Sequence, residues 1–109
     1  MATNYKVLGQ SNPSATTATT LYTTPSATQT IVSTITVCNQ AATAGTYRIA
    51  VRIAGAALAA AQYVAYDVSL PGNATDTLTL GVTLGATDVI TVYASSANFS
   101  FNAYGSELS

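Results

Sequence analysis

The ten residues Thr30–Asn39, TIVSTITVCN, decide the fold class of this chain. They carry no charge and are rich in β-branched side chains, which favour strands over helices. Ile31, Ile35 and Val37 are expected on one face of this strand. The residues on the other face are small or apolar enough to be buried as well, so the stretch predicts a central strand.

The two stretches that follow have the alternation of half-buried strands. Gly45–Ile53 reads GTYRIAVRI and Gln62–Leu70 reads QYVAYDVSL, with apolar residues at every second position. The alanine-rich Ala54–Ala61 between them is too short for a stable helix. We therefore expect an antiparallel hairpin in which paired residue numbers sum to about 115. The pairs expected in this register are Arg48–Asp67 and Arg52–Tyr63 on the outer side, and Ile49–Tyr66 and Val51–Val64 on the core side.

Turn residues divide the rest of the chain into further short strands, spaced by roughly ten residues. The additional segments expected as strands are Asn4–Gln10, Ala15–Thr24, Thr75–Leu84, Val89–Ala94 and Asn98–Tyr104. The last two are expected to pair as a hairpin, with Ile90, Val92 and Ala94 meeting Ala103, Phe101 and Phe99 on the core side.

This pattern predicts one all-β domain over residues 1–109. The expected architecture is an antiparallel β-sandwich of the jelly-roll or immunoglobulin-like type, with about seven or eight short strands and no long helix. Residues 1–26 allow two interpretations. They form either an edge strand of the domain or, in part, an extended arm that becomes ordered on a neighbouring subunit.

The composition is unusually poor in charge. Charged residues make up 6% of the chain and the formal net charge is -1, whereas about a quarter of a typical soluble domain is charged. The abundance of β-branched and aromatic residues argues against disorder. Because neutral surfaces promote association, we expect much of the surface to be covered by copies of the same chain, as a trimer or higher array, or by partner proteins.

The residues needed for catalysis or metal binding are scarce. The chain contains no histidine, so the usual general base and the usual transition-metal ligand are missing. Without an activating base, Cys38 is expected to be a small buried residue rather than a nucleophile. The carboxylates Asp67, Asp76, Asp88 and Glu107 lie in four different segments. We therefore predict no enzyme activity, no catalytic residue, no cofactor and no metal site.

Two other functional classes are also disfavoured. Lys6, Arg48 and Arg52 are the only cations, too few to follow a nucleic-acid backbone. No stretch of about 18 apolar residues is present, so we expect no membrane-spanning helix. Met1–Gln10 lacks the pattern of a signal peptide, and synthesis in a cytoplasm is the expectation.

The seven tyrosines suggest a contact surface, since tyrosine is enriched at protein–protein interfaces. Tyr47 and Tyr66 are expected to face the core, and the others to face outward. The residues predicted to contact partners are Tyr5, Tyr22, Arg48, Arg52, Tyr63 and Tyr93.

The chain also resembles a group of short phage-encoded virion proteins that are frequent in marine and cyanobacterial phages. The segments that carry the resemblance are Tyr5–Gln10, Leu21–Pro25, Ile49–Arg52, Tyr63–Asp67, Leu78–Ala94 and Phe101–Glu107.

The resemblance implies a structural role in the virion, assembled in the host cytoplasm. The leading expectation is a capsid decoration (cement) protein whose partners are copies of itself and the major capsid or tail proteins. The alternative is a tail, baseplate or fibre component that binds a receptor or glycan. From the residues alone, an aromatic face beside a polar group suits a glycan, and the two expected pairs of this kind are Tyr63 with Arg52 and Tyr93 with Asn98. The resemblance implies no particular binding residues.

Overall fold

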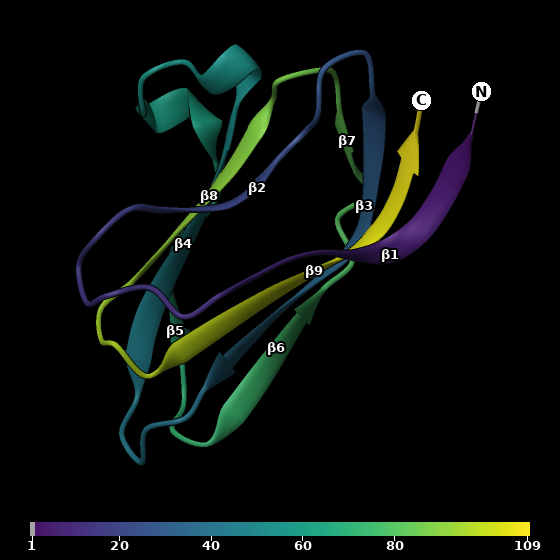
Figure 1. Ribbon diagram of the computed structural model, residues 1–109. Helices are drawn as coiled ribbons and strands as arrows, with labels where there is room; N and C mark the ends of the chain where they lie inside the picture. Colours follow the sequence, from purple (N-terminus) through teal and green to yellow (C-terminus); the bar gives the residue numbers. More distant parts are fainter. Residues whose placement is uncertain (1) are drawn as a thin grey trace.

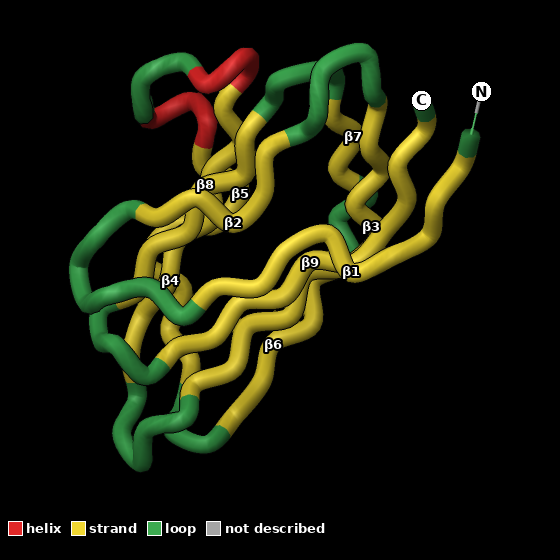
Figure 2. Tube along the Cα trace, viewed as in Figure 1, coloured by secondary structure: helices red, strands yellow, loops and turns green. Residues whose placement is uncertain are grey.

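The computed structural model describes residues 2–109, which form two antiparallel sheets packed face to face (Figures 1 and 2). The first, here called the β3 sheet, has the order β1 (Thr3–Ser11), β9 (Phe99–Leu108), β3 (Gln29–Asn39) and β6 (Ala74–Leu78), with β7 (Val82–Leu84) also paired to β3. The second, the β4 sheet, has the order β2 (Thr19–Thr23), β8 (Val89–Ala94), β4 (Gly45–Arg52) and β5 (Tyr63–Leu70).

The predicted all-β sandwich is therefore confirmed. The nine strands within residues 2–109 exceed the expected number because Thr75–Leu84 divides into β6 and β7, which pair with different halves of β3. Gly81 lies between them with a φ of 64°. In this part of the chain the helical elements are two single 3₁₀ turns, η1 (Ile53–Gly55) and η2 (Ala60–Gln62). None of the described helices is long and apolar enough to cross a membrane.

The core lies between the sheets and is built around three aromatic rings. Tyr47 of β4 packs edge-on against Phe101 of β9, with ring centroids 6.2 Å apart, and lies 6.4 Å from Phe99. All three side chains are almost completely buried. The prediction that Tyr47 faces the core is confirmed.

A β-bulge in β3 changes which residues reach this core. The pairing of β3 with β9 shifts between Val32 and Thr34. As a result Val32 is buried, together with Ile35 and Val37, whereas 43% of Ile31 is exposed. The expectation that Ile31 shares a face with Ile35 and Val37 was wrong, because a regular alternation does not allow for the extra residue of a bulge. Cys38 is only half-buried, on the outer side of the strand.

The predicted hairpin of β8 and β9 was wrong as well. The two strands belong to different sheets and face each other across the core. The loop between β8 and β9 passes from one sheet to the other. At its start, the N–H of Ser95 donates a hydrogen bond to the carbonyl of Thr46 in the β4 sheet, and at its end the carbonyl of Asn98 accepts one from the N–H of Gln40, just after β3. The residues expected on the core side are nonetheless buried, namely Ile90, Val92, Ala94, Phe99, Phe101 and Ala103.

The hairpin of β4 and β5 is confirmed, but its predicted register holds only at the end farthest from the loop that joins the two strands. Tyr47 pairs with Val68 as expected, and Ile49 then pairs with Ala65 because β5 is bulged. A second irregularity brings Tyr63 opposite Ala50. Tyr66, which we expected in the core, is consequently 57% exposed.

Candidate functional site

Arg48 is the centre of a polar and aromatic cluster on the outer face of the β4 sheet. Its guanidinium carbon lies 4.3 Å from the ring centroids of both Tyr66 and Tyr93. Its Nε donates a hydrogen bond to Oδ1 of Asp67 at 2.6 Å, and a second nitrogen donates to Oδ2 at 3.2 Å. Hydrogen bonding to Arg48 holds the pKa of the Asp67 carboxyl below its usual value. We call Arg48, Asp67, Tyr63, Tyr66 and Tyr93 the arginine cluster.

Bulges in β5 bring the tyrosines of this cluster together. Residues three positions apart in a regular strand point to opposite faces. Tyr63 and Tyr66 instead meet edge to face, with ring centroids 4.9 Å apart. Asp67 has a φ of 49°, a left-handed conformation that few residues other than glycine adopt. The ion pair with Arg48 stabilises the bulge, as does the stacking of Tyr66 on the same guanidinium.

A shallow hollow of about 520 Å³ adjoins the arginine cluster, and its lining is mainly apolar. The lining residues come from the η1–η2 loop and the start of β5: Leu58, Ala59, Ala60, Tyr63 and Tyr66. A planar ring beside an open apolar hollow can accommodate a sugar ring or an apolar side chain.

Arg52 was predicted to contact partners beside Tyr63, but the structure gives it a different set of neighbours. It donates hydrogen bonds to the carbonyl oxygens of Ala56 at 2.7 Å and Gly55 at 2.9 Å, and to the hydroxyl of Thr91 at 3.3 Å. Its guanidinium thus fixes the loop after β4, and the expected pair of Arg52 with Tyr63 was wrong.

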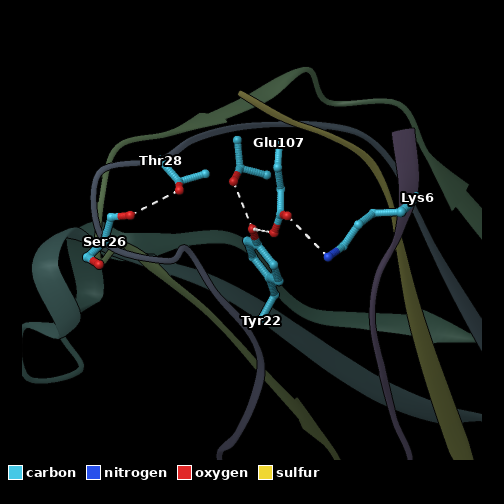
Figure 3. Close-up of polar contacts among 6 residues, drawn as sticks. Lys6, Tyr22, Ser26, Thr28 and Glu107 are labelled. Carbon is cyan, nitrogen blue, oxygen red and sulfur yellow. Dashed lines mark hydrogen bonds and ion pairs between the residues drawn. The ribbon is translucent and has the colours of Figure 1, made fainter. Parts of the chain in front are cut away.

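Tyr22 was predicted to face outward, but it is buried, with 7% of the residue exposed. It extends from β2 across the sandwich, where its hydroxyl donates to Oε2 of Glu107 at 2.5 Å and lies 2.8 Å from the hydroxyl of Thr30 (Figure 3). Lys6 lies on the other side of this carboxylate, with Nζ 3.1 Å from Oε1. These four residues form the inter-sheet cluster. Sequence alternation could not reveal it, because the partners lie 8 and 85 positions away from Tyr22.

Burial and the hydrogen bond between Tyr22 and Glu107 shift the pKa values of both side chains. Burial, with the neighbouring carboxylate, raises the pKa of Tyr22 to about 12. The hydrogen bond from Tyr22, and then the bond and charge of Lys6, hold the pKa of Glu107 below its usual value. Both shifts favour a neutral phenol bonded to a charged carboxylate.

The outer face of the β3 sheet contains no charged side chain within residues 2–109. The pairings place Tyr5, Ser106 and Ile31 in one row across three strands, and Val7, Tyr104 and Thr34 in the next. The rows beyond these consist of Gln10, Asn102, Thr36 and Thr77, and of Ser100, Cys38 and Thr75. We call these four rows the uncharged face.

The charged side chains all lie elsewhere. Lys6 and Glu107 belong to the inter-sheet cluster, and Asp76 accepts a hydrogen bond from the hydroxyl of the core residue Tyr47 at 2.8 Å. Asp88 lies in a turn, where it accepts from two backbone amides. Arg48, Arg52 and Asp67 belong to the β4 sheet.

The uncharged face also exposes large apolar side chains. Tyr5 is 84% exposed, the most of any large apolar residue in the described chain, and Val7, Ile31 and Tyr104 are each at least 36% exposed. Exposed apolar side chains that gather on one face mark an interaction surface. Of the predicted contact residues, Tyr5 therefore lies on the uncharged face, and Arg48, Tyr63 and Tyr93 lie in the arginine cluster.

Residues 2–109 contain no group of three or more Cys, Asp or Glu side chains placed to hold a metal ion. The four carboxylates make separate contacts with Tyr47, Arg48, Lys6 or backbone amides. Among residues 2–109, exposed aromatic side chains gather on two surfaces, the uncharged face and the arginine cluster with its hollow.

Comparison with known proteins gives no match: no family model, curated protein or solved structure is significantly similar to this chain.

Proposed function

We propose that this chain is a non-enzymatic structural protein of a phage particle, which binds in many copies as a capsid decoration protein. The observation that carries the proposal is the uncharged face, with Tyr5, Val7, Ile31 and Tyr104 exposed on it. The cores of protein interfaces are depleted in charge and enriched in aromatic residues. A face of this kind is better suited to contact with protein than to permanent exposure to water.

The resemblance to small virion proteins gives this contact surface a biological setting. A decoration protein binds the assembled shell in preference to its free subunits, and any such binding stabilises the assembly by mass action. The partners in this proposal are the major capsid protein and neighbouring copies of the chain. The protein would be made in the host cytoplasm and would reside in the virion.

Co-sedimentation with purified particles, after the mass in solution has been measured by size-exclusion chromatography with light scattering, tests the proposal. Tyr104→Lys places a charge at the centre of the uncharged face and should reduce particle binding at least tenfold. Tyr66→Lys places the same charge on the opposite side of the sandwich and should leave binding unchanged. If the parent protein is not retained by particles, or if the two variants behave alike, the proposal fails.

A receptor- or glycan-binding role in a tail, baseplate or fibre is the second candidate, and the hollow beside the arginine cluster favours it. Sugar rings stack on exposed aromatic side chains, and Tyr63 and Tyr66 form one wall of the hollow. In a glycan array this role predicts binding that Tyr66→Ala abolishes and Tyr104→Lys leaves intact. Absence of glycan binding by a protein that still enters particles would leave the decoration role alone.

A further inference from the structure

We infer that two copies of this chain join through the outer edge of β1, pairing antiparallel so that Tyr5 of one copy lies opposite Tyr5 of the other. The inference rests on the proposed function in one respect, which is that the protein acts in several copies. Beyond the proposed function, the inference specifies the edge through which two copies join, the register of the pairing and the hydrogen bonds that form.

The first half of β1 is a sheet edge without a partner among residues 2–109. β1 is the terminal strand of its sheet and pairs only with β9. Its residues from Thr3 to Val7 are all exposed. The pairing with β9 is regular over this half, and its only irregularity comes later, between Val7 and Gly9.

The hydrogen bonds of the neighbouring pair show which backbone groups this edge presents. Ala2 and Ser109 exchange two hydrogen bonds, one at 2.7 Å and one at 2.9 Å. Such doubly bonded pairs alternate along an antiparallel ladder. Asn4 and Lys6 therefore direct their N–H and C=O groups toward β9, whereas Thr3, Tyr5 and Val7 direct theirs outward.

A second copy of the same edge satisfies these outward groups in one register. With Tyr5 opposite Tyr5, Thr3 lies opposite Val7 of the other copy, and each of these pairs can exchange two hydrogen bonds. The intervening residues Asn4 and Lys6 then lie opposite each other across the junction. Moving the register by two residues toward the C-terminus would instead oppose Lys6 to Lys6, and like charges directly opposite each other are destabilising.

The charges near this edge are compatible with self-pairing. Lys6 is the only charged residue of β1. In the Tyr5-centred register its ammonium group, which pairs with Glu107 on the inner side of the sheet, lies opposite the uncharged Asn4 of the other copy. On the outer side, the junction brings two uncharged faces side by side, with the Tyr5 rings at their meeting line. Aromatic cross-strand pairs of this kind are stabilising.

The other sheet edges are less suited to this pairing. β5 contains two irregularities in its register, β2 has five residues and one irregularity, and the opposite edge of the β3 sheet is divided between β6 and β7. Bulges and short edge strands are the usual means by which proteins prevent edge-to-edge association. β1 is nine residues long, and its first half is free of register irregularities.

Cysteine cross-linking tests the register directly. In a Cys38→Ser background, Asn4→Cys and Lys6→Cys are prepared as separate proteins, one of them with a mass tag. Residues opposite each other in a non-hydrogen-bonded pair have Cα atoms about 4.5 Å apart, within the range that a disulfide spans. Mild oxidation of the mixture should give the mixed disulfide at least tenfold faster than oxidation of either protein alone. Equal rates in the mixed and unmixed samples would overturn the inference.

A proline substitution tests the hydrogen bonds. Tyr5→Pro removes an N–H that points away from β9, so it should preserve the fold while weakening dimerisation at least tenfold in light scattering. Tyr5→Ala keeps that N–H and serves as the matched control, with a smaller loss. Circular dichroism checks that both variants remain folded. A parent that stays monomeric at all concentrations, or a dimer that Tyr5→Pro does not weaken, would contradict the inference.

The outcomes also separate this inference from the proposed function. A dimer with the Tyr5-centred register that never binds particles supports the pairing and refutes the decoration role. A monomer that binds particles refutes the pairing and supports the decoration role. If that binding is lost in Tyr5→Pro, the edge receives a strand from a capsid protein, and a second copy is the wrong occupant.

Discussion

The hydroxyl of Tyr22 on β2 and the carboxylate of Glu107 on β9 are joined by a hydrogen bond of 2.5 Å that links the two sheets. Both residues are buried, and hydrogen bonds to charged groups contribute more to stability than neutral ones. The inter-sheet cluster is thus a buried polar connection between the two sheets.

Tyr22→Phe should destabilise the protein by about 1–3 kcal/mol, because it removes the donor to a buried carboxylate and leaves the ring in place. For a domain of this size, each kcal/mol lowers the melting temperature by about 4–8 °C. Thermal unfolding followed by circular dichroism measures the change. Tyr104→Phe removes the same hydroxyl from an exposed residue and should have almost no effect. Equal melting temperatures for the two variants would show that the inter-sheet hydrogen bond adds no stability.

Acid should weaken the fold through Glu107. The ordinary pKa of this carboxyl is 4.5, and the fold lowers it, so the folded state prefers the charged form. This stabilisation is complete above pH 4.5 and is lost as the pH falls through the lowered value. Urea unfolding at a series of pH values should show this loss in the parent, and Glu107→Gln should show a flatter profile.

Asp67 provides the control for the acid experiment. Its pKa is lowered as well, but it lies on the surface, where salt screens its interaction with Arg48. Asp67→Asn should therefore retain most of the pH dependence. If Asp67→Asn flattens the profile as much as Glu107→Gln, the assignment to the inter-sheet cluster is wrong.

The left-handed backbone at Asp67 predicts an order of stability among its variants. Asp67→Gly and Asp67→Ala both remove the ion pair with Arg48, but only glycine adopts a φ of 49° without strain. Asp67→Ala should therefore be less stable than Asp67→Gly by about 1–2 kcal/mol. Chemical denaturation measures the difference. Equal stabilities would mean that β5 loses its bulge once the carboxylate is removed.

Gly105 should not tolerate a side chain. A Cβ at this position would lie 2.0 Å from the carbonyl oxygen of Ile31 on the neighbouring strand. Gly105→Ala should therefore displace the β3–β9 pairing and cost about 3 kcal/mol or more. Gly85→Ala is the control, because its Cβ would have 3.6 Å to its nearest neighbour, an oxygen of Asp88. A Gly105→Ala protein as stable as the control would show that the two strands can separate without cost.

The strands and much of the core could be predicted from sequence, because β-branched residues and alternating polarity act locally. The pairing of strands could not. The alternation that buries Ile90 and Phe101 is the same whether their strands lie side by side or face each other across the core. Bulges were missed for a related reason, since the extra residue in β3 between Val32 and Thr34 changes the phase of the pattern without leaving a distinctive residue.

The candidate surfaces could be predicted in part. Arg48, Tyr63 and Tyr93 were expected at a surface and lie together there, whereas Tyr66 was expected in the core. Tyr22 illustrates the opposite error, because an amphipathic tyrosine fits an exposed strand and a buried polar contact equally well. These two environments of Tyr22 can be distinguished only once the position of β2 relative to β9 is known in three dimensions.

The lack of ions on one side of the sandwich also affects how fast contacts can form there. Charged patches attract a partner over distances of about a Debye length and accelerate encounter, whereas neutral partners associate at about 10⁵–10⁶ M⁻¹s⁻¹. Encounters at this side of the molecule are governed by diffusion and orientation alone. The rate of assembly should thus be nearly the same at low and at high ionic strength. It should depend chiefly on the concentration of the protein in the cell.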